Sequence, residues 1–134
     1  MDAPEASQPT PSPRLLIMLK AARGYHVVDV RMILSIEADT RYAVLRLLDG
    51  RGLAVFHTLS VLEEWLQCGE RYGDLLFLRI HRSHIVAFHH TDRIEGKHIV
   101  SHSGTHFPVS RQYWPTIRKV AVSIRTNGVA VHDT

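Results

Sequence analysis

The segment FLRIHRSHIV, residues 77–86, contains a compact group of side chains suited to binding an anionic partner. Its apolar strand pattern is interrupted by Arg79, His81, Arg82 and Ser83 and resumes directly afterwards. Guanidinium groups form forked hydrogen bonds with phosphate and with guanine, and a serine hydroxyl can add a contact to phosphate. A solvated strand end would also explain these residues, so the segment by itself leaves both interpretations open.

Two further segments carry similar chemistry. The turn ADTRY, residues 38–42, presents Thr40 and Arg41 between two apolar strands. The segment PVSRQYW, residues 108–114, places Arg111 and Gln112 on the first turn of an expected helix, where backbone N–H groups also favour phosphate. Three loops of the same kind in one small domain predict an extended surface for an anionic polymer.

The elements that must position these loops are mostly short strands. Apolar, β-branched segments separated by turn residues predict five strands in the first half, and Asp49-Gly50 is a hairpin signal before the last of them. Five more candidates follow in the second half, broken by Gly96 and Gly104. The ten expected strands are 15–20, 25–30, 32–39, 42–48, 53–56, 75–80, 85–88, 91–96, 98–101 and 105–109.

One segment between the strands changes to helical spacing. Leucines 59, 62 and 66 together with Trp65 fall on one face of this helix, which predicts a stripe packed in the core. Ser60 followed by Glu63 is the pattern of a capping box, so the helix is expected to begin there and to end near Gly69.

A second helix is expected after Ser110, with Pro115 tolerated best in its first turn. The sequence leaves open whether the chain beyond it forms another strand or a tail. The predicted organisation is a disordered Pro-rich leader at 1–13, a mainly antiparallel β domain at 14–122 and a tail or extra strand at 123–134.

Composition bounds the class of protein. At 134 residues the chain is expected to be one domain, its one cysteine excludes an internal disulfide, and no apolar run is long enough to span a membrane. The leader lacks the basic start and apolar run of a secretory signal, so a cytoplasmic location is expected. All 16 basic residues but only 10 of the 13 acidic residues lie between Arg14 and Arg125, which favours an anionic partner weakly.

The ten histidines raise a metal hypothesis that local spacing does not support. His89 and His90 are adjacent and point to opposite faces of a strand, while His98 and His102 lie roughly 13 Å apart along one. The chain has no CxxC, HExxH, GxSxG or glycine-rich phosphate loop, so no metal, cofactor or catalytic site is predicted and the protein is not expected to be an enzyme. A metal sensor built from distant histidines stays an open alternative.

Four segments resemble, in order, the LytTR (LytR/AlgR-type) DNA-binding domain of bacterial response regulators and related transcription factors. They are ILSIEADTRYAVLRL, TLSVLEEWL, FLRIHRSHIVAF and GTHFPVSRQYW, and the resemblance covers residues 15–120. It implies a β-β-β sandwich of about ten short, mostly antiparallel strands with one or two short helices and no helix-turn-helix. Such domains insert loops into successive major grooves on one side of the DNA.

The resemblance implies which residues contact DNA. Arg82 and Arg111 are the expected contacts to base edges, whereas Thr40, Arg41, Ser83 and Gln112 are expected on phosphates, and Tyr42 either contacts DNA or packs. The full set of expected DNA-binding residues is Asp39, Thr40, Arg41, Tyr42, Arg79, His81, Arg82, Ser83, Arg111 and Gln112.

Two departures from the family pattern are visible. Ala87 follows HIV where the family often has asparagine, and only a short leader precedes the domain where relatives usually carry a sensory domain. A stand-alone regulator controlled by a membrane or sensory partner protein and a fragment of a longer regulator both stay open. The expected function is sequence-specific regulation of transcription by two copies on a direct-repeat operator in double-stranded DNA, without a small-molecule substrate. The alternative is a protein-interaction module of the same fold.

Overall fold

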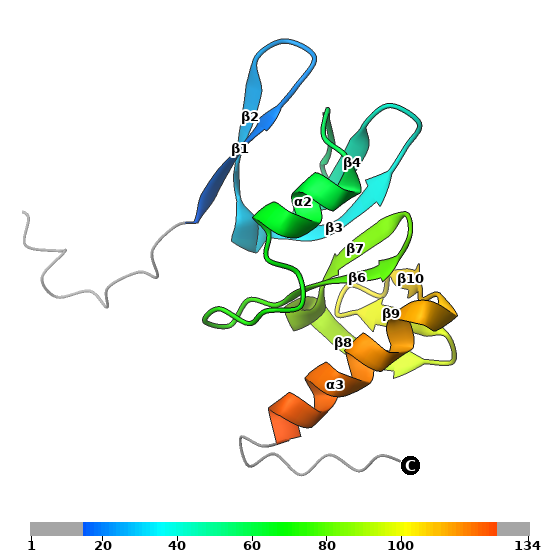
Figure 1. Cartoon of the computed structure of the whole chain (residues 1–134). Coiled ribbons are helices and arrows are strands. Elements are labelled where there is room, and N and C mark those ends of the chain that lie inside the picture. Colours follow the sequence, from blue (N-terminus) through cyan, green and yellow to red (C-terminus); the bar gives the residue numbers. More distant parts are fainter. Residues whose placement is uncertain (1–14, 126–134) are drawn as a thin grey trace, which may run out of the picture.

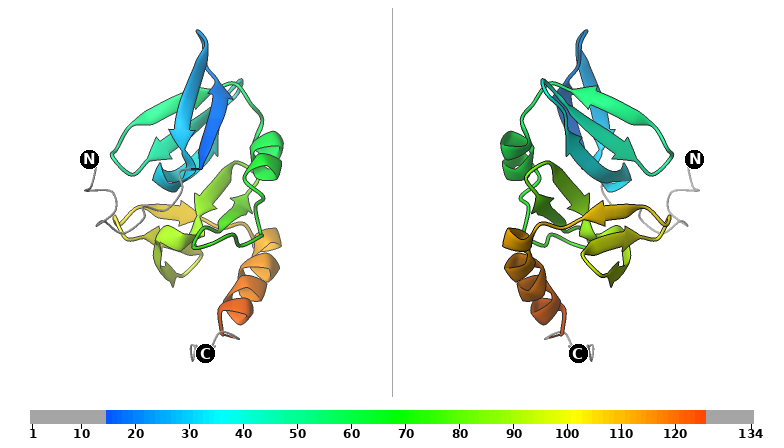
Figure 2. Two further views of the ribbon diagram at one scale, coloured as in Figure 1. Left: turned by 90° about the vertical axis from the view of Figure 1, so that its left-hand side faces the viewer. Right: turned by 90° about the vertical axis from the view of Figure 1, so that its right-hand side faces the viewer.

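Ten short strands in three antiparallel sheets form most of the protein in this computed structural model, which describes residues 15–125 and places side chains through Val120. The sheets follow one another as layers, with two helices against them (Figures 1 and 2). The strands are β1 (Leu16–Lys20), β2 (Tyr25–Asp29), β3 (Ile33–Ala38), β4 (Ala43–Leu47), β5 (Gly52–Val55), β6 (Phe77–His81), β7 (His84–Ala87), β8 (Thr91–Glu95), β9 (His98–Ser101) and β10 (His106–Pro108).

The central layer is a five-stranded sheet in the order β5-β4-β3-β7-β6. A two-stranded sheet, β1-β2, lies on one side of it, and a three-stranded sheet, β10-β9-β8, lies on the other. The predicted fold class is confirmed, and each of the ten predicted strands is present with its ends shifted by two residues at most. None of the helices in the described part of the chain is long and apolar enough to cross a membrane.

Strands β6 and β7 lie between two hydrophobic cores. Phe77 and Ile85 belong to the core shared with the β1-β2 hairpin and α2 (Leu59–Trp65), whereas Leu78 and Val86 belong to the core under β9, β10 and α3 (Trp114–Arg125). Successive side chains of a strand point to opposite faces, so two cores bury alternate residues of the same strand. This burial on both faces explains the nearly continuous apolar pattern of these strands.

Helix α2 forms as predicted, but it begins two residues earlier. Thr58 is its N-cap, and the Thr58 hydroxyl accepts a hydrogen bond of 3.2 Å from the Val61 N–H. The expected capping box at Ser60 is therefore wrong. After the helix, Gln67 and Gly69 adopt positive φ values of 50° and 89°, which ends the helical path near the expected glycine.

The prediction that one face of α2 packs in the core is confirmed for the three leucines and wrong for Trp65. Leu59, Leu62 and Leu66 are at most 5% exposed, but Trp65 is 48% exposed and contacts the ring of His57 edge-on at 4.8 Å. Trp65 is the last residue of the helix, and its side chain lies at the edge of the packed surface and not over the sheet.

The C-terminal segment is helical where a tail or strand was expected to begin. A 3-10 turn at Arg111–Tyr113 leads into α3, Pro115 lies in the first turn of α3, and the helix continues through Arg125. Ser110 occupies the N-cap position of the 3-10 turn without a side-chain capping bond. The expected leader at 1–13 and residues 126–134 of the expected tail lie outside the described residues.

The two candidate caps of α2 give different predictions. Replacing Thr58 by Ala removes the acceptor for the Val61 N–H and should lower the free energy of unfolding by about 1 kcal/mol, measured by urea denaturation. The matched change Ser60→Ala should stay within about 0.5 kcal/mol of the parent. A larger loss for Ser60→Ala than for Thr58→Ala would contradict the observed start of the helix.

Candidate nucleic-acid interface

The three loops singled out by their chemistry lie side by side at one edge of the molecule. Strands β3 and β7 pair up to the register Glu37 with His84, and the next hydrogen bond runs from the Ala38 N–H to the Ser83 carbonyl at 2.8 Å. On the other side, the Ser110 N–H donates to the Ile80 carbonyl at 2.9 Å. The loops 39–42, 82–83 and 110–112 are therefore tied together through main-chain hydrogen bonds, and all three face the right-hand side of Figure 1.

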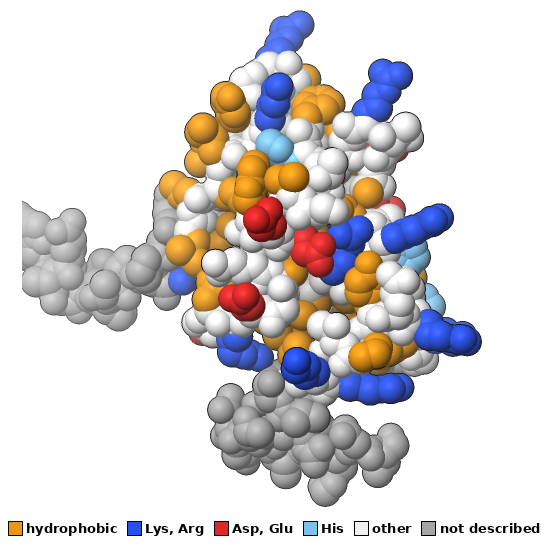
Figure 3. Space-filling model, in the orientation of Figure 1, with side chains coloured by type: hydrophobic (Ala, Val, Ile, Leu, Met, Phe, Trp, Pro, Cys, Tyr) orange, Lys and Arg blue, Asp and Glu red, His pale blue; other side chains and the backbone are white. Residues whose placement is uncertain are grey.

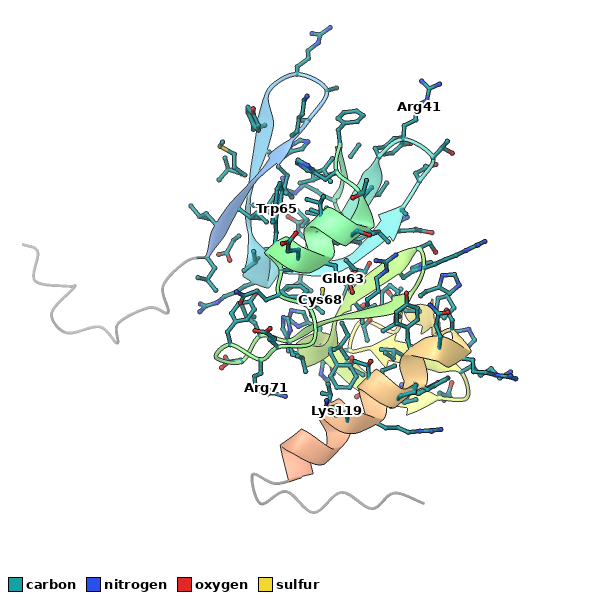
Figure 4. The ribbon with its side chains drawn as sticks, viewed as in Figure 1. Arg41, Glu63, Trp65, Cys68, Arg71 and Lys119 are labelled. Atoms are coloured by element: carbon teal, nitrogen blue, oxygen red, sulfur yellow. The ribbon has the colours of Figure 1, made fainter. Side chains whose placement is uncertain are left out.

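The first loop is a tight turn held by Asp39. The Asp39 N–H donates to the Tyr42 carbonyl at 2.7 Å, and the Asp39 carboxylate accepts from the Thr40 N–H at 2.6 Å. The Thr40 N–H and then the Tyr42 hydroxyl lower the pKa of the Asp39 carboxyl, and the same carboxylate raises the pKa of Tyr42. The ring of Tyr42 also packs edge-on against Phe56 at 6.0 Å. Asp39 and Tyr42 shape the turn, while Arg41 projects from it (Figure 4).

The second loop is fixed from below by Arg79. Its side chain is only 14% exposed, and its Nη1 donates to a carboxylate oxygen of Glu63 on α2 at 2.9 Å. Its Nε donates to the His81 carbonyl at 2.9 Å, and its Nη2 donates to the Arg82 carbonyl. One guanidinium therefore bridges two carbonyls of the loop and also connects the loop to helix α2. The predicted DNA contact through Arg79 is not tested by this geometry, which gives the residue a positioning role.

Ser83 and the two histidines beside it are also engaged within the protein. The Ser83 hydroxyl lies 2.9 Å from Nδ1 of His81 and 2.8 Å from Nδ1 of His84. His84 Nε2 lies 3.6 Å from the Glu37 carboxylate, and burial lowers the pKa of His84 despite that neighbour. The hydroxyl of Ser83, expected on a phosphate, thus bridges two rings inside the loop.

The remaining predicted residues present their side chains to solvent. Three guanidinium groups, those of Arg41, Arg82 and Arg111, are exposed, and none has an ion-pair partner within residues 15–125. Thr40 and Gln112 are exposed beside them. Lys and Arg side chains extend from the right-hand edge in the space-filling view (Figure 3). This edge exposes cations and hydrogen-bond donors, which suit an anionic polymer.

A depression between the first loop and the start of α2 belongs to the same edge. It has a volume of about 340 Å³, with Arg41 and Arg82 among its lining residues. It is also lined by Phe56, Thr58 and Ser60, which are not among the residues predicted to bind DNA. Their place in the chain is the one sign of this role, because they lie between the end of β5 and the first turn of α2, beside the first loop.

The metal hypothesis and the state of Cys68 can both be examined in the structure. Within residues 15–125, no group of three or more His, Cys, Asp or Glu side chains is placed to hold a metal ion. Burial, with a further contribution from Glu63, raises the pKa of the Cys68 thiol to about 12, so the thiol is protonated at neutral pH. A protonated thiol is a poor nucleophile.

The positioning role of Arg79 can be measured. Arg79→Leu leaves the His81 and Arg82 carbonyls and the Glu63 carboxylate without this donor, so the free energy of unfolding should fall by about 1 to 3 kcal/mol. Arg82→Leu, a control with an exposed side chain in the same loop, should change it by about 0.5 kcal/mol or less. Equal stability of the two variants in urea denaturation would show that Arg79 does not support the loop.

Comparisons with known proteins identify the family and the fold. The chain matches the family model of the LytTr DNA-binding domain over residues 23–121. A solved structure, described as a LytTr DNA-binding domain of a response regulator from Bacillus cereus, shares the fold with a TM-score of 0.65 at 23% sequence identity, covering 81% of this chain and 98% of that one. No curated protein matches the sequence. Since the family model spans well over half of the sequence, the chain belongs to the LytTR family of DNA-binding domains.

Proposed function

We propose that this protein is a transcriptional regulator that recognises a specific sequence in duplex DNA through the major groove. Membership of the LytTR family establishes DNA binding in general, with double-stranded DNA as the partner. The observation that carries the finer proposal is the pair of main-chain hydrogen bonds, Ala38 to Ser83 and Ser110 to Ile80, that aligns three cationic loops at one edge. The major groove of DNA is about 12 Å wide, which is enough to admit a two-stranded β-ribbon and the loop at its end.

The exposed side chains and the engaged side chains have different roles in this proposal. Arg82 and Arg111 contact base edges, because a free guanidinium can fork onto guanine O6 and N7. Arg41, Thr40 and Gln112 contact phosphates and set the register of the protein on the duplex.

The engaged residues shape these loops instead of touching DNA. Asp39 and Tyr42 hold the first turn, and Arg79, His81 and Ser83 hold the second. This assignment moves five residues of the predicted DNA-binding set into a positioning role.

The family resemblance supplies the rest of the proposal. Two copies bind a direct-repeat operator, the protein acts in the cytoplasm without catalysis, and a membrane or sensory partner protein provides the signal. In this arrangement each copy presents the same three loops to one side of the double helix.

Base contacts and phosphate contacts can be separated by their response to sequence. After an operator is selected from a random duplex pool, Arg82→Ala and Arg111→Ala should each weaken binding to it by about 1 to 3 kcal/mol while changing binding to random DNA little. Arg118→Ala, an exposed arginine on α3, is the matched control and should leave the preference intact. Equal losses on operator and random duplexes would refute contact of Arg82 and Arg111 with bases.

The number of neutralised phosphates sets the salt dependence. If about four phosphates are neutralised, the logarithm of the binding constant should fall with the logarithm of salt concentration at a slope near −3.6. Arg41→Ala should make that slope shallower by about 1 for operator and random duplexes alike. A slope that does not change would remove Arg41 from the phosphate contacts.

A further inference from the structure

The outer face of the β1-β2 hairpin is apolar and uncovered. Leu16, Met18, Tyr25 and Val27 are 57%, 59%, 61% and 64% exposed, respectively. Leu19 and Val28, which follow Met18 and Val27 on the opposite face of the hairpin, are at most 4% exposed and belong to the core. Figure 2, left, shows this hairpin in front with no other described element over it, and Figure 3 shows hydrophobic side chains gathered there.

Isolated exposed hydrophobic residues are ordinary, but a contiguous face of large ones is a sign of a binding surface. Met18 pairs directly with Val27 across the two strands, so the two side chains form the centre of the face. Leu16 and Tyr25 extend it toward the two ends. Trp65, exposed near this hairpin, shares a groove with Leu16 and Met18 that enlarges the apolar surface.

The charges at the two ends of this face have opposite signs. The strand register pairs Leu16 with Asp29 at one end and Lys20 with Tyr25 at the other. The Asp29 carboxylate is half-buried and accepts a hydrogen bond from the Arg31 N–H at 3.0 Å, whereas Lys20 is exposed. The face therefore runs from this hydrogen-bonded anion through an apolar centre to a cation. A second copy turned end over end would place the Asp29 end over the Lys20 end, with Met18 and Val27 near the two-fold axis. Such self-complementarity is the requirement for an isologous dimer.

We propose that the outer face of the β1-β2 hairpin packs against the same face of a second copy of this chain. The hairpin strands have five residues each, about 17 Å, so the contact is smaller than the about 800 Å² per partner of a standard stable interface. The dimer should therefore depend on protein concentration.

This dimer would leave the DNA-binding edge of each copy free. In Figure 1 the hairpin lies on the left and the three loops face right. A two-fold dimer presents its two edges in opposite orientation, whereas neighbours on a direct repeat are related by translation along the DNA. The hairpin contact is thus distinct from contacts between copies on one operator, and it suits a dimer that joins two separate duplex segments.

Sedimentation of the full chain without DNA tests the contact. The parent should shift from monomer to dimer as concentration rises, and Met18→Glu, which brings two carboxylates together at the axis, should stay monomeric over the same range. Leu48→Glu, at a residue 45% exposed elsewhere on the surface, should dimerise like the parent. Circular dichroism melting would confirm that both variants are folded. A monomeric parent at all concentrations, a dimer of Met18→Glu, or equal loss in Leu48→Glu would overturn the proposal.

Proximity across the axis gives a second readout. A bis-maleimide that spans about 10 Å, the usual distance between packed sheets, should link two copies of Val27→Cys through residue 27. The parent, with Cys68 alone, and Arg118→Cys on α3 should give much less linked dimer. Equal linkage in all three proteins would contradict the two-fold contact. Because Met18→Glu leaves the loops unchanged, its affinity for a single operator half-site should equal that of the parent, so failure of the dimer would not count against DNA binding.

Discussion

The register between β3 and β7 is the constraint on which the candidate interface depends. It places the ends of both strands at the same edge, so that the Ala38 N–H meets the Ser83 carbonyl. A slip of one residue would turn alternate side chains to the wrong core, because Ile85 and Val86 are buried on opposite faces. Two cores therefore enforce the register, and the register sets the spacing of the loops.

In the proposed function, the positioning of loops and the contact with DNA are divided among neighbouring residues. Arg79, Arg82 and Ser83 lie in one short hairpin and have polar side chains suited to phosphate. Of these three, only Arg82 has an exposed side chain without a partner among the residues that the structure describes. The Arg79 guanidinium donates its hydrogen bonds to carbonyls of the loop and to the Glu63 carboxylate. Loops without a recognition helix need such internal support, since an exposed turn loses conformational entropy when it orders on a partner.

Local patterns were sufficient for the strands, and contacts distant in sequence explain the errors. Strand periodicity and turn residues found all ten strands, and residue chemistry found the three loops. The carboxylate of Glu63, expected in a capping box, instead pairs with Arg79, sixteen residues away, and local patterns gave no sign of this contact or of the positioning role of Arg79. The helix expected after Ser110 is present, and Ile117 and Val120 are buried at helical spacing against the second core. It continues through Arg125, into a segment for which the sequence left a strand and a tail open.

The central claim is that one edge of this protein, formed by three loops, faces DNA. Amide chemical shifts followed by NMR during titration with an operator duplex test it most directly. The account predicts that the largest changes cluster at residues 39–42, 81–83 and 110–112, while the outer face of the β1-β2 hairpin and strand β8 change little. Changes concentrated on the hairpin or on β8, with the three loops unaffected, would contradict it.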